Sequence, residues 1–157
     1  MIGERLAAAR EGRGAVLFLP GRAGFGKTRL LAEAVAMAGR TGVRAGFGAV
    51  QASDQAVPMS GLIAALFDGR EPLVDPGALR SLHFLPEQRY WLLEELESLL
   101  EEAALASPVL VCIDDMHWGD GGSLTALRTL PPRLAHLPIM WLVSFREGQA
   151  GPSCGRR

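Results

Sequence analysis

Eight consecutive residues near the start of the chain have the types and the spacing of a phosphate-binding loop, or P-loop. They match the pattern G-x-x-x-x-G-K-[ST] without substitution and read Gly21-Arg22-Ala23-Gly24-Phe25-Gly26-Lys27-Thr28. In such a loop the glycines let the backbone curl until its N–H groups face phosphate oxygens, and the dipole of the next helix adds to the attraction. The Lys side chain reaches the β- and γ-phosphates, and the Thr hydroxyl binds Mg²⁺. The stretch therefore predicts a nucleotide site with Lys27 on the phosphates and Thr28 on the metal.

The lysine of this loop is the only lysine in the chain, and every other permanently cationic side chain is an arginine. A compact ammonium can reach between two phosphates, whereas the planar guanidinium of Arg does not replace it there. A chain that otherwise uses Arg has Lys at the one position where the loop pattern requires it. This supports the interpretation of the motif.

The segments on both sides of the loop have the patterns that it requires. Residues 15–19 form a short apolar run typical of a buried parallel strand. Residues 29–38 are rich in Ala and Leu with apolar side chains at helical spacing, and Gly39 is expected to end this helix. Strand, glycine loop and helix follow in the required order, which makes a chance glycine-rich turn a poor explanation.

The composition predicts one globular domain and gives no electrostatic argument for nucleic-acid or membrane binding. The 157 residues are 48% hydrophobic, and the formal net charge is −1. The sequence shows no signal peptide and no apolar run of membrane-spanning length. Cys112 and Cys154 stand in a strand-like and a polar segment, so no disulfide is expected between them, and a cytoplasmic location is predicted.

Further along, apolar patterns and turn residues predict an alternation of strands and helices. Strands are expected at residues 43–50, 109–113 and 139–144, although glycines weaken the first of them. Helices are expected at residues 4–11, 60–67, 86–106 and 124–137, the last interrupted by Pro131-Pro132. The apolar face of the longest helix is expected to consist of Tyr90, Leu93, Leu96, Leu99 and Leu100.

This alternation predicts an α/β fold with a mainly parallel sheet covered by helices on both faces. Ligands of such sheets bind at the carboxyl ends of the strands. The glycine loop, Asp114-Asp115 and Arg146 each follow or end a predicted strand. We therefore expect them to meet at one edge of the sheet.

The two aspartates end a fully apolar strand, which is the pattern of a Walker B element. Asp114 is expected to hold Mg²⁺ near the nucleotide phosphates, through water. Asp115 is the candidate that orients or deprotonates the attacking water. Adjacent carboxylates repel each other unless a cation is present, which itself favours a metal site.

A longer motif makes the comparison more specific. It reads Asp114-Asp115-Met116-His117-Trp118-Gly119-Asp120 and is followed by Ser123-Leu124. Here the chain resembles the STAND class of signalling ATPases, in the AAA+-like group of P-loop proteins. It is most similar to the N-terminal ATPase module of large ATP-binding LuxR-type transcriptional regulators. Their loop reads Gly-x-x-Gly-hydrophobic-Gly-Lys-Thr-Arg-Leu, which extends the match to Arg29 and Leu30, and the resemblance covers about residues 14–147.

The resemblance implies a three-layer α/β/α P-loop core, ATP and Mg²⁺ as ligands, and a nucleotide switch in a signalling or transcription-regulatory protein. It also implies that Arg29 belongs to the nucleotide-binding stretch. Arg146, which ends the last predicted strand, is implied to contact the γ-phosphate. A cation at that strand end could distinguish a triphosphate from a diphosphate.

The other polar residues of the motif are interpreted as structural. His117 lacks neighbouring Cys or His partners for a metal, so His117 and Trp118 are expected to position the loop after the strand. Asp120 is expected to cap the following helix, with Ser123 as the alternative cap.

Regulators of the resembled class are several times longer than this chain. They continue into a fifth core strand, a helical lid and a DNA-binding helix-turn-helix. We therefore expect a fragment, a truncated reading frame or a minimal module, with the ATPase core at residues 1–147 and a disordered tail at residues 148–157. Without the fifth strand, residues 15–19 are expected to form an exposed apolar edge that pairs with another chain. Without the lid, the chain is expected to bind ATP weakly and to hydrolyse it slowly or not at all.

Two alternatives from other functional classes remain open. One is a small-molecule P-loop kinase, although no Arg-rich lid segment is visible. The other is a non-catalytic interaction scaffold that keeps the P-loop fold. Direct DNA binding by this chain is not expected, because no helix-turn-helix or basic stripe is visible.

Overall fold

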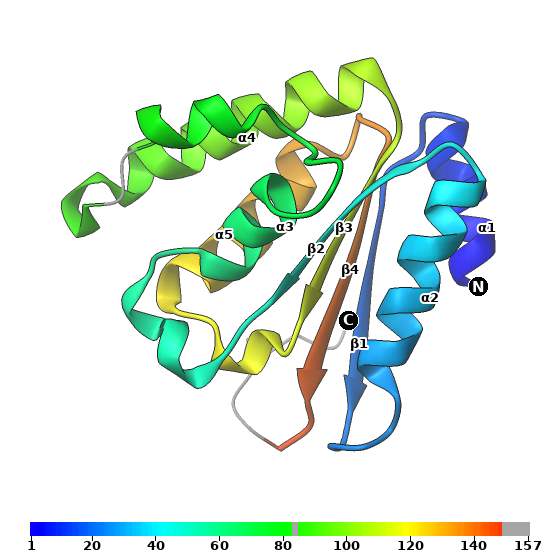
Figure 1. Cartoon of the computed structure of the whole chain (residues 1–157), viewed down its shortest axis with the longest axis horizontal. Helices are drawn as coiled ribbons and strands as arrows, with labels where there is room; N and C mark the ends of the chain where they lie inside the picture. The colour runs from blue at the N-terminus through cyan, green and yellow to red at the C-terminus, as the bar shows by residue number, and fades with distance from the viewer. Residues whose placement is uncertain (83–84, 149–157) are drawn as a thin grey trace.

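The computed structural model describes residues 1–82 and 85–148, which form a four-stranded sheet between two layers of helices (Figure 1). The strands are β1 (Ala15–Gly21), β2 (Arg44–Ala49), β3 (Val109–Asp114) and β4 (Ile139–Arg146). All three neighbouring pairs are parallel, and the order across the sheet is β1-β4-β3-β2. Cys154 and all but the first residue of the predicted tail lie outside the described residues.

In the described part of the chain, five α-helices cover the two faces of the sheet. They are α1 (Ile2–Arg10), α2 (Lys27–Arg40), α3 (Ser60–Phe67), α4 (Arg89–Ala106) and α5 (Gly121–Arg133). Helices α1 and α2 lie on one face, while α3, α4 and α5 lie on the other (Figure 1). Short 3-10 helices lie in the connections between these elements: η1 (Ala52–Ala56), η2 (Pro76–Ser81), η3 (Pro86–Gln88) and η4 (Met116–Trp118). The predicted three-layer α/β/α fold with a parallel sheet is confirmed.

The alternation of side chains along the strands produces two hydrophobic cores. Leu110, Cys112, Met140 and Leu142 pack with α1 and α2. Their strand neighbours Val109, Val111, Ile113, Ile139, Trp141 and Val143 pack with α3, α4 and α5. Because β3 and β4 are buried on both faces, their sequences are continuously apolar.

Several helix boundaries and faces differ from the sequence-based expectations. Gly39 lies inside α2, which ends at Arg40 before Gly42 in the left-handed conformation. Tyr90 is 61% exposed rather than part of the apolar face of α4, because the first turn of this helix lies away from the strands (Figure 1). Leu92 is buried in the core instead.

Helix α5 contains Pro131 and Pro132 without interruption and ends at Arg133, not at Leu137 as predicted. Both prolines lie in its last turn, where each lacks the N–H that would bond to the carbonyl four residues back, on Leu127 and Arg128. The N–H of Leu134 still donates to the carbonyl of Leu130 at 2.9 Å. The last turn therefore remains helical.

The glycines of β2 permit an unusually close approach of α3 to the sheet. A Cβ atom on Gly46 would lie 1.8 Å from the carbonyl oxygen of Ala65, and one on Gly48 would lie 2.0 Å from that of Gly61. These glycines weakened the sequence pattern of the strand. The structure shows that they are required by packing instead.

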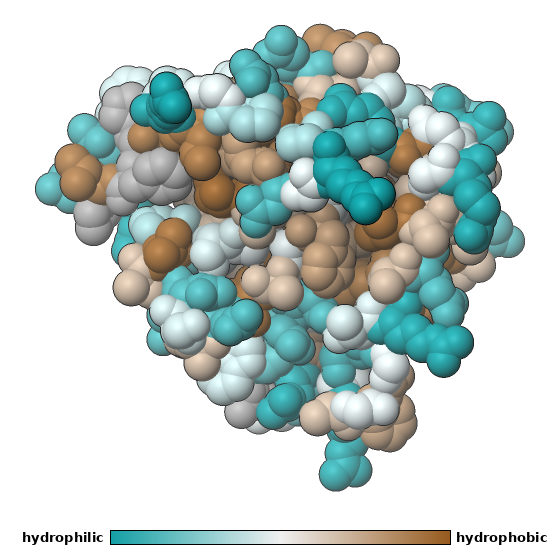
Figure 2. All heavy atoms as spheres, viewed as in Figure 1, coloured by the Kyte–Doolittle hydropathy of each residue, from teal (hydrophilic) through white to brown (hydrophobic). Residues whose placement is uncertain are grey.

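The two edge strands of the sheet, β1 and β2, differ in how far other parts of the chain cover them. At the β2 edge, the guanidinium of Arg44 donates to the carbonyl oxygens of Pro72 and Leu73, which covers the start of the strand. At the β1 edge, Val16 and Phe18 are 39% and 45% exposed. Polar and apolar residues otherwise alternate in small patches over the face in Figure 2.

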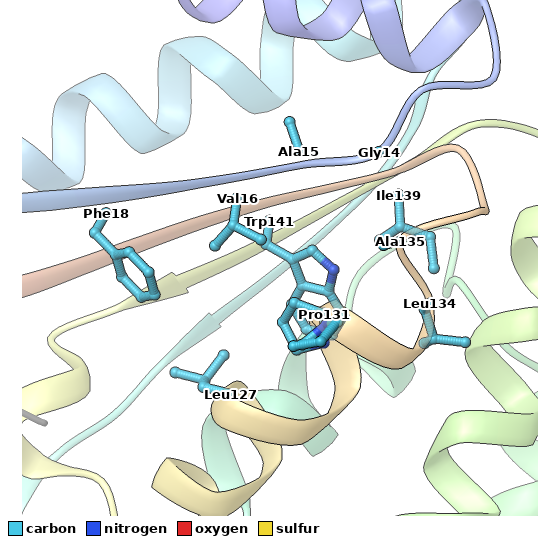
Figure 3. A pocket seen from close by; sticks show the side chains of 11 residues that line it. Gly14, Ala15, Val16, Phe18, Leu127, Pro131, Leu134, Ala135, Ile139 and Trp141 are labelled. Atoms are coloured by element: carbon cyan, nitrogen blue, oxygen red, sulfur yellow. The ribbon is translucent and has the colours of Figure 1, made fainter. Parts of the chain in front are cut away.

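The β1 edge borders an apolar groove of about 400 Å³ between this strand and α5. Val16 and Phe18 point to the same side of the sheet as Trp141 and face Leu127 and Pro131 of α5 (Figure 3). The predicted exposed apolar edge at residues 15–19 is therefore present on this face. On the opposite face, Leu17 and Leu19 pack against α1 and α2.

Candidate nucleotide site

The carboxyl ends of β1, β3 and β4 meet at one edge of the sheet, as the sequence predicts. Strand β1 ends at Gly21, the first residue of the glycine loop, and Gly21 pairs in register with Arg146 at the end of β4. Strand β3, next to β4, ends at Asp114. Parallel pairing thus assembles three segments that are far apart in the sequence.

The glycine loop connects β1 directly to α2. Gly24 and Gly26 have φ angles of 82° and 74°, a region that L side chains rarely adopt, and Gly26 is the N-cap of α2. No heavy atom lies within 4 Å of a Cβ built on either glycine, so both face open space. Lys27 and Thr28 then occupy the first turn of α2, where backbone N–H groups have no helical partner.

The ammonium group of Lys27 folds back over this loop. Its Nζ donates to the carbonyl oxygens of Gly21 and Arg22, both at 2.8 Å. These two contacts hold the end of the side chain inside the curve of the loop. The ammonium therefore lies against the loop that the motif predicts to bind phosphate.

A direct hydrogen bond joins the loop to the Walker B strand. The hydroxyl of Thr28 donates to Oδ2 of Asp114 at 2.6 Å, across 86 residues of sequence. Asp114 is only 3% exposed, and its other oxygen, Oδ1, accepts from the backbone N–H of Asp115 at 3.0 Å. The two residues predicted to share a metal ion are thus in contact.

Ser144 belongs to the same cluster and was not singled out from the sequence. Its hydroxyl donates to Oδ1 of Asp114 and accepts from the backbone N–H of Asp115 at 3.0 Å. The side chain is fully buried in β4. One signal was available: Ser144 is a polar residue that ends an apolar strand pattern, two positions before Arg146.

A comparison with known families agrees with this geometry. The profile of the AAA ATPase domain matches residues 2–142. The chain belongs to the AAA ATPase domain family. No curated protein matches the chain.

Among solved structures, a chain in "Structure of Drosophila ORC bound to GC-rich DNA and Cdc6" is similar to this AAA ATPase domain. The identity is 17% and the TM-score 0.43, over 94% of this chain and 48% of that chain. This chain therefore spans about half the length of the other. None of the described helices of this AAA ATPase domain is long and apolar enough to span a membrane.

The second aspartate of the AAA ATPase domain has an unusual backbone. Asp115 has a φ of 55° and a ψ of 40°, in the left-handed region, and is one of two described non-glycine residues with positive φ. Its side chain is 45% exposed. Such conformations cost free energy and persist where the surrounding structure holds them. Here the N–H of Asp115 donates to Asp114 and Ser144, which holds the residue that begins the turn η4.

Turn η4 places His117 and Trp118 next to each other, with ring centroids 5.0 Å apart. Trp118 packs against the core on the α5 side of the sheet, in line with the predicted structural role. The side chain of His117 is only 1% exposed. Burial lowers the pKa of His117, and the positive charges of Arg146 and Lys27 lower it further against the opposing effect of Asp115.

Asp120 caps α5, as predicted. Its carboxylate accepts from the N–H groups of Gly122 and Ser123 at 3.0 and 2.9 Å, and from the N–H of Met59 at 3.1 Å. Burial alone would raise the pKa of Asp120, but these bonds and the hydroxyl of Ser123 hold it below its usual value. The alternative prediction, that Ser123 is the cap, is wrong because Ser123 lies inside the helix.

The other residues predicted to belong to the nucleotide site differ in solvent exposure and in their contacts. Arg22, Ala23 and Phe25 are exposed in the loop. The guanidinium of Arg29 pairs with Glu33 at 3.1 Å on the surface of α2, rather than with a group of the site. Arg146 is half-buried, and its charge reaches the ring of His117.

The side chains of the site fit both predicted ligands. A hydroxyl and a carboxylate oxygen in contact are a hard oxygen pair of the kind that Mg²⁺ uses beside nucleotide phosphates. No group of three or more His, Cys, Asp or Glu that could hold a metal ion by itself occurs among the described residues. A shared ion between Thr28, Asp114 and phosphates suits this limited set of protein ligands.

Proposed function

We propose that this AAA ATPase domain binds ATP with Mg²⁺ and acts as a nucleotide switch in a signalling or transcription-regulatory protein. The family supports nucleotide binding in general. The regulatory context rests on the resemblance to STAND ATPases through residues 114–120 and the loop. A change of nucleotide would alter the state of the regulator, and hydrolysis would reset it.

The observation that carries the proposal is the hydrogen bond between Thr28 and Asp114. Many glycine turns bind nothing, and many strands end in aspartate. Here the hydroxyl of Thr28, at the start of α2, contacts the buried carboxylate of Asp114 from strand β3. This contact supports a shared site for phosphate and metal.

We assign the phosphate-binding role to the loop and the first turn of α2. Lys27 would exchange its two carbonyl contacts for the β- and γ-phosphates, while the backbone N–H groups of the loop surround the phosphates. Thr28 and Asp114 would hold Mg²⁺, which offsets the charge of the phosphates when bound. The full proposed nucleotide-binding set is Gly21, Arg22, Ala23, Gly24, Phe25, Gly26, Lys27, Thr28 and Arg29.

We assign hydrolysis, where it occurs, to Asp115 and Arg146. The half-exposed carboxylate of Asp115 can accept a proton or a hydrogen bond from an attacking water. Arg146 would contact the γ-phosphate from the end of β4, next to the first glycine of the loop. The carboxylate orients the water, and the guanidinium offsets developing negative charge.

We further propose that residues 1–147 form the ATPase core and that the β1 edge is a protein contact. The exposed Val16 and Phe18 and the apolar groove beside α5 support pairing with a strand of a partner or of a second copy. This agrees with the non-catalytic scaffold alternative as well. The nucleotide site and the edge can be tested separately because they use different residues.

The Mg²⁺ dependence of ATP binding tests the proposal. Thr28→Val keeps the branched shape of the side chain but removes the hydroxyl. We expect the gain in ATP affinity on adding Mg²⁺ to fall about tenfold or more, as is common when a metal environment loses a polar partner. Thr125→Val is the matched control, since the Thr125 hydroxyl only donates to the carbonyl of Gly121 on the surface of α5. Equal Mg²⁺ dependence in wild type and Thr28→Val would contradict the assignment.

A further inference from the structure

The ring of His117 is enclosed beside the proposed nucleotide site without any hydrogen-bond partner. Its side chain is 1% exposed, and neither Nδ1 nor Nε2 has a partner among the described residues. Buried polar atoms without partners are rare, because they lose their hydrogen bonds to water and gain none in return. Loop positioning alone, the role expected from the sequence, does not explain a histidine here, since an apolar ring would fill the same space.

The groups around His117 are those of the proposed site. Nδ1 lies 3.8 Å from Oδ1 of Asp115, about 1 Å beyond the usual N–H···O distance. The charges of Lys27, Asp114 and Arg146 also act on the ring. One buried imidazole is therefore close to the proposed water-orienting carboxylate and feels the charges proposed to bind phosphate.

The side chains of His117 and Asp115 differ in freedom of movement. The ring of His117 is held by burial and by contact with Trp118. The carboxylate of Asp115 is 45% exposed and is therefore open to solvent. Because the ring is fixed and the carboxylate is not, rotation of the Asp115 side chain is the simplest way to close the gap of about 1 Å.

Nucleotide binding gives a physical reason for this rotation. Phosphates at the mouth of the loop displace water from Asp115 and repel its negative charge. A carboxylate that loses water needs another donor, and a hydrogen bond in a water-excluded site is stronger than one in solution. A neutral imidazole has one N–H to donate, and Nδ1 is the ring nitrogen paired with Asp115.

We propose that His117 is a positioning residue for Asp115: with nucleotide and Mg²⁺ bound, Nδ1–H of His117 donates a hydrogen bond to the Asp115 carboxylate. That bond fixes one carboxylate oxygen and leaves the other for the attacking water. The inference rests on the proposed function, because it concerns the orientation of a side chain that matters only when nucleotide is bound.

The tautomer of His117 gives a test that does not require turnover. Proton–nitrogen correlation spectra of the histidine rings are recorded with and without Mg²⁺ and a non-hydrolysable ATP analogue. The chain has three histidines, and His117→Asn identifies the signals of His117 by their loss. We expect saturating analogue to produce the Nδ1–H tautomer at His117, while His136 serves as an internal control.

Substitutions separate positioning from packing. His117→Phe fills the space without a donor, His117→Asn places an amide nitrogen near the position of Nδ1, and His117→Gln places one near Nε2. We expect His117→Phe and His117→Gln to lower the single-turnover rate about tenfold or more with little change in analogue affinity, and His117→Asn to restore much of it.

Titration of analogue binding distinguishes the two ways in which these experiments can fail. If a folded wild-type chain does not bind the analogue, the proposed function is wrong and the inference falls with it. If the analogue binds but the His117 signals stay unchanged or show the Nε2–H tautomer, the positioning role is overturned while the nucleotide site stands. An Nδ1–H tautomer that appears only with bound analogue supports the inference.

Discussion

At the residue scale, two carboxylates join distant segments at the site: Asp114 accepts a hydrogen bond from Thr28, and Asp120 accepts one from Met59. Asp120 is an example, since it accepts hydrogen bonds from the first turn of α5 and from the N–H of Met59. Met59 has a φ of 55° and is the N-cap of α3. One carboxylate therefore fixes the starts of two helices beside the turn that carries Asp115 and His117.

Asp120→Ala is expected to lower the free energy of unfolding by about 1–2 kcal/mol at pH 7, the usual cost of losing a helix cap. Asp75→Ala is the matched control, because Asp75 caps the exposed turn η2 through a single bond to Gly77. Urea unfolding measures both variants. A loss for Asp120→Ala no larger than that for Asp75→Ala would contradict the role in joining α3 and α5.

The same carboxylate predicts a pH dependence. Since folding holds the pKa of Asp120 below its usual value, its contribution is fully present above the pKa of the unfolded chain. It is lost as the pH falls through the lower pKa of the folded state. We expect the stability difference between wild type and Asp120→Asn to shrink when urea unfolding is repeated below pH 4. A difference that is constant from pH 7 to the acid limit would count against this explanation.

Cys112 gives a second residue-scale prediction. Burial in β3, helped by the negative charge of Asp114, raises the pKa of the Cys112 thiol to about 12. Because the thiolate is the reactive form, Cys112 should not react with a thiol reagent at pH 8 until the chain unfolds. Labelling of a Cys154→Ser variant, with and without urea, measures this. Rapid labelling of the folded variant would show that β3 is not the buried central strand described.

At the element scale, the sequence predicted the order and type of nearly all helices and strands, because apolar periodicity is local information. Residues 60–67 were predicted as a helix with the bounds that α3 has in the structure. The sequence could not show why Gly46 and Gly48 occur in β2, since that depends on the distance between α3 and the sheet. Tyr90 was misplaced for a similar reason: its spacing fits an apolar face, but no sheet lies under the first turn of α4.

The packing around each glycine predicts opposite effects of Gly→Ala on stability at Gly48 in β2 and at Gly39 in α2. Gly48→Ala adds a methyl group where the carbonyl of Gly61 would lie 2.0 Å away, so α3 must move. We expect it to destabilise the fold by about 1–3 kcal/mol or more, the usual cost of overpacking.

Gly39→Ala is the matched control, because Gly39 lies inside α2 with no atom within 4 Å of an added Cβ. It should stabilise the fold by about 0.5–1 kcal/mol. Thermal unfolding monitored by circular dichroism compares the two variants. Equal effects of the same sign would contradict the packing of α3 on β2.

At the scale of the whole molecule, the two edges of the sheet differ, since Arg44 covers the start of β2 whereas Val16 and Phe18 are exposed on β1. The sequence predicted the parallel sheet and its ligand edge, because motifs at strand ends meet by topology. It also predicted the loop and Asp114, since their residue types are fixed by phosphate and metal chemistry. The contact of Ser144 with Asp114 and the partnerless ring of His117 could not be predicted, because both depend on how the folded chain brings distant segments together.

The exposed β1 edge predicts that the chain self-associates and that a single added negative charge on this strand prevents it. Phe18→Asp places a carboxylate on the exposed face of β1, at the mouth of the groove in Figure 3. We expect the apparent mass of the wild type to rise with concentration in sedimentation experiments, and that of Phe18→Asp to stay monomeric. Leu105→Asp, which makes the same type of change on the exposed surface of α4, should behave like wild type. A wild-type chain that stays monomeric at high concentration would leave no role for this edge in self-association.

The most direct test of the nucleotide site is a titration of the purified chain with a fluorescent ATP analogue and Mg²⁺, beside Lys27→Ala. Arg40→Ala, at the opposite end of α2, controls for the loss of one positive charge. Saturable binding by wild type and Arg40→Ala, lost in a folded Lys27→Ala, is the result predicted here. Equal binding by all three chains, or none by a folded wild type, would contradict the assignment of residues 21–28 as the phosphate site.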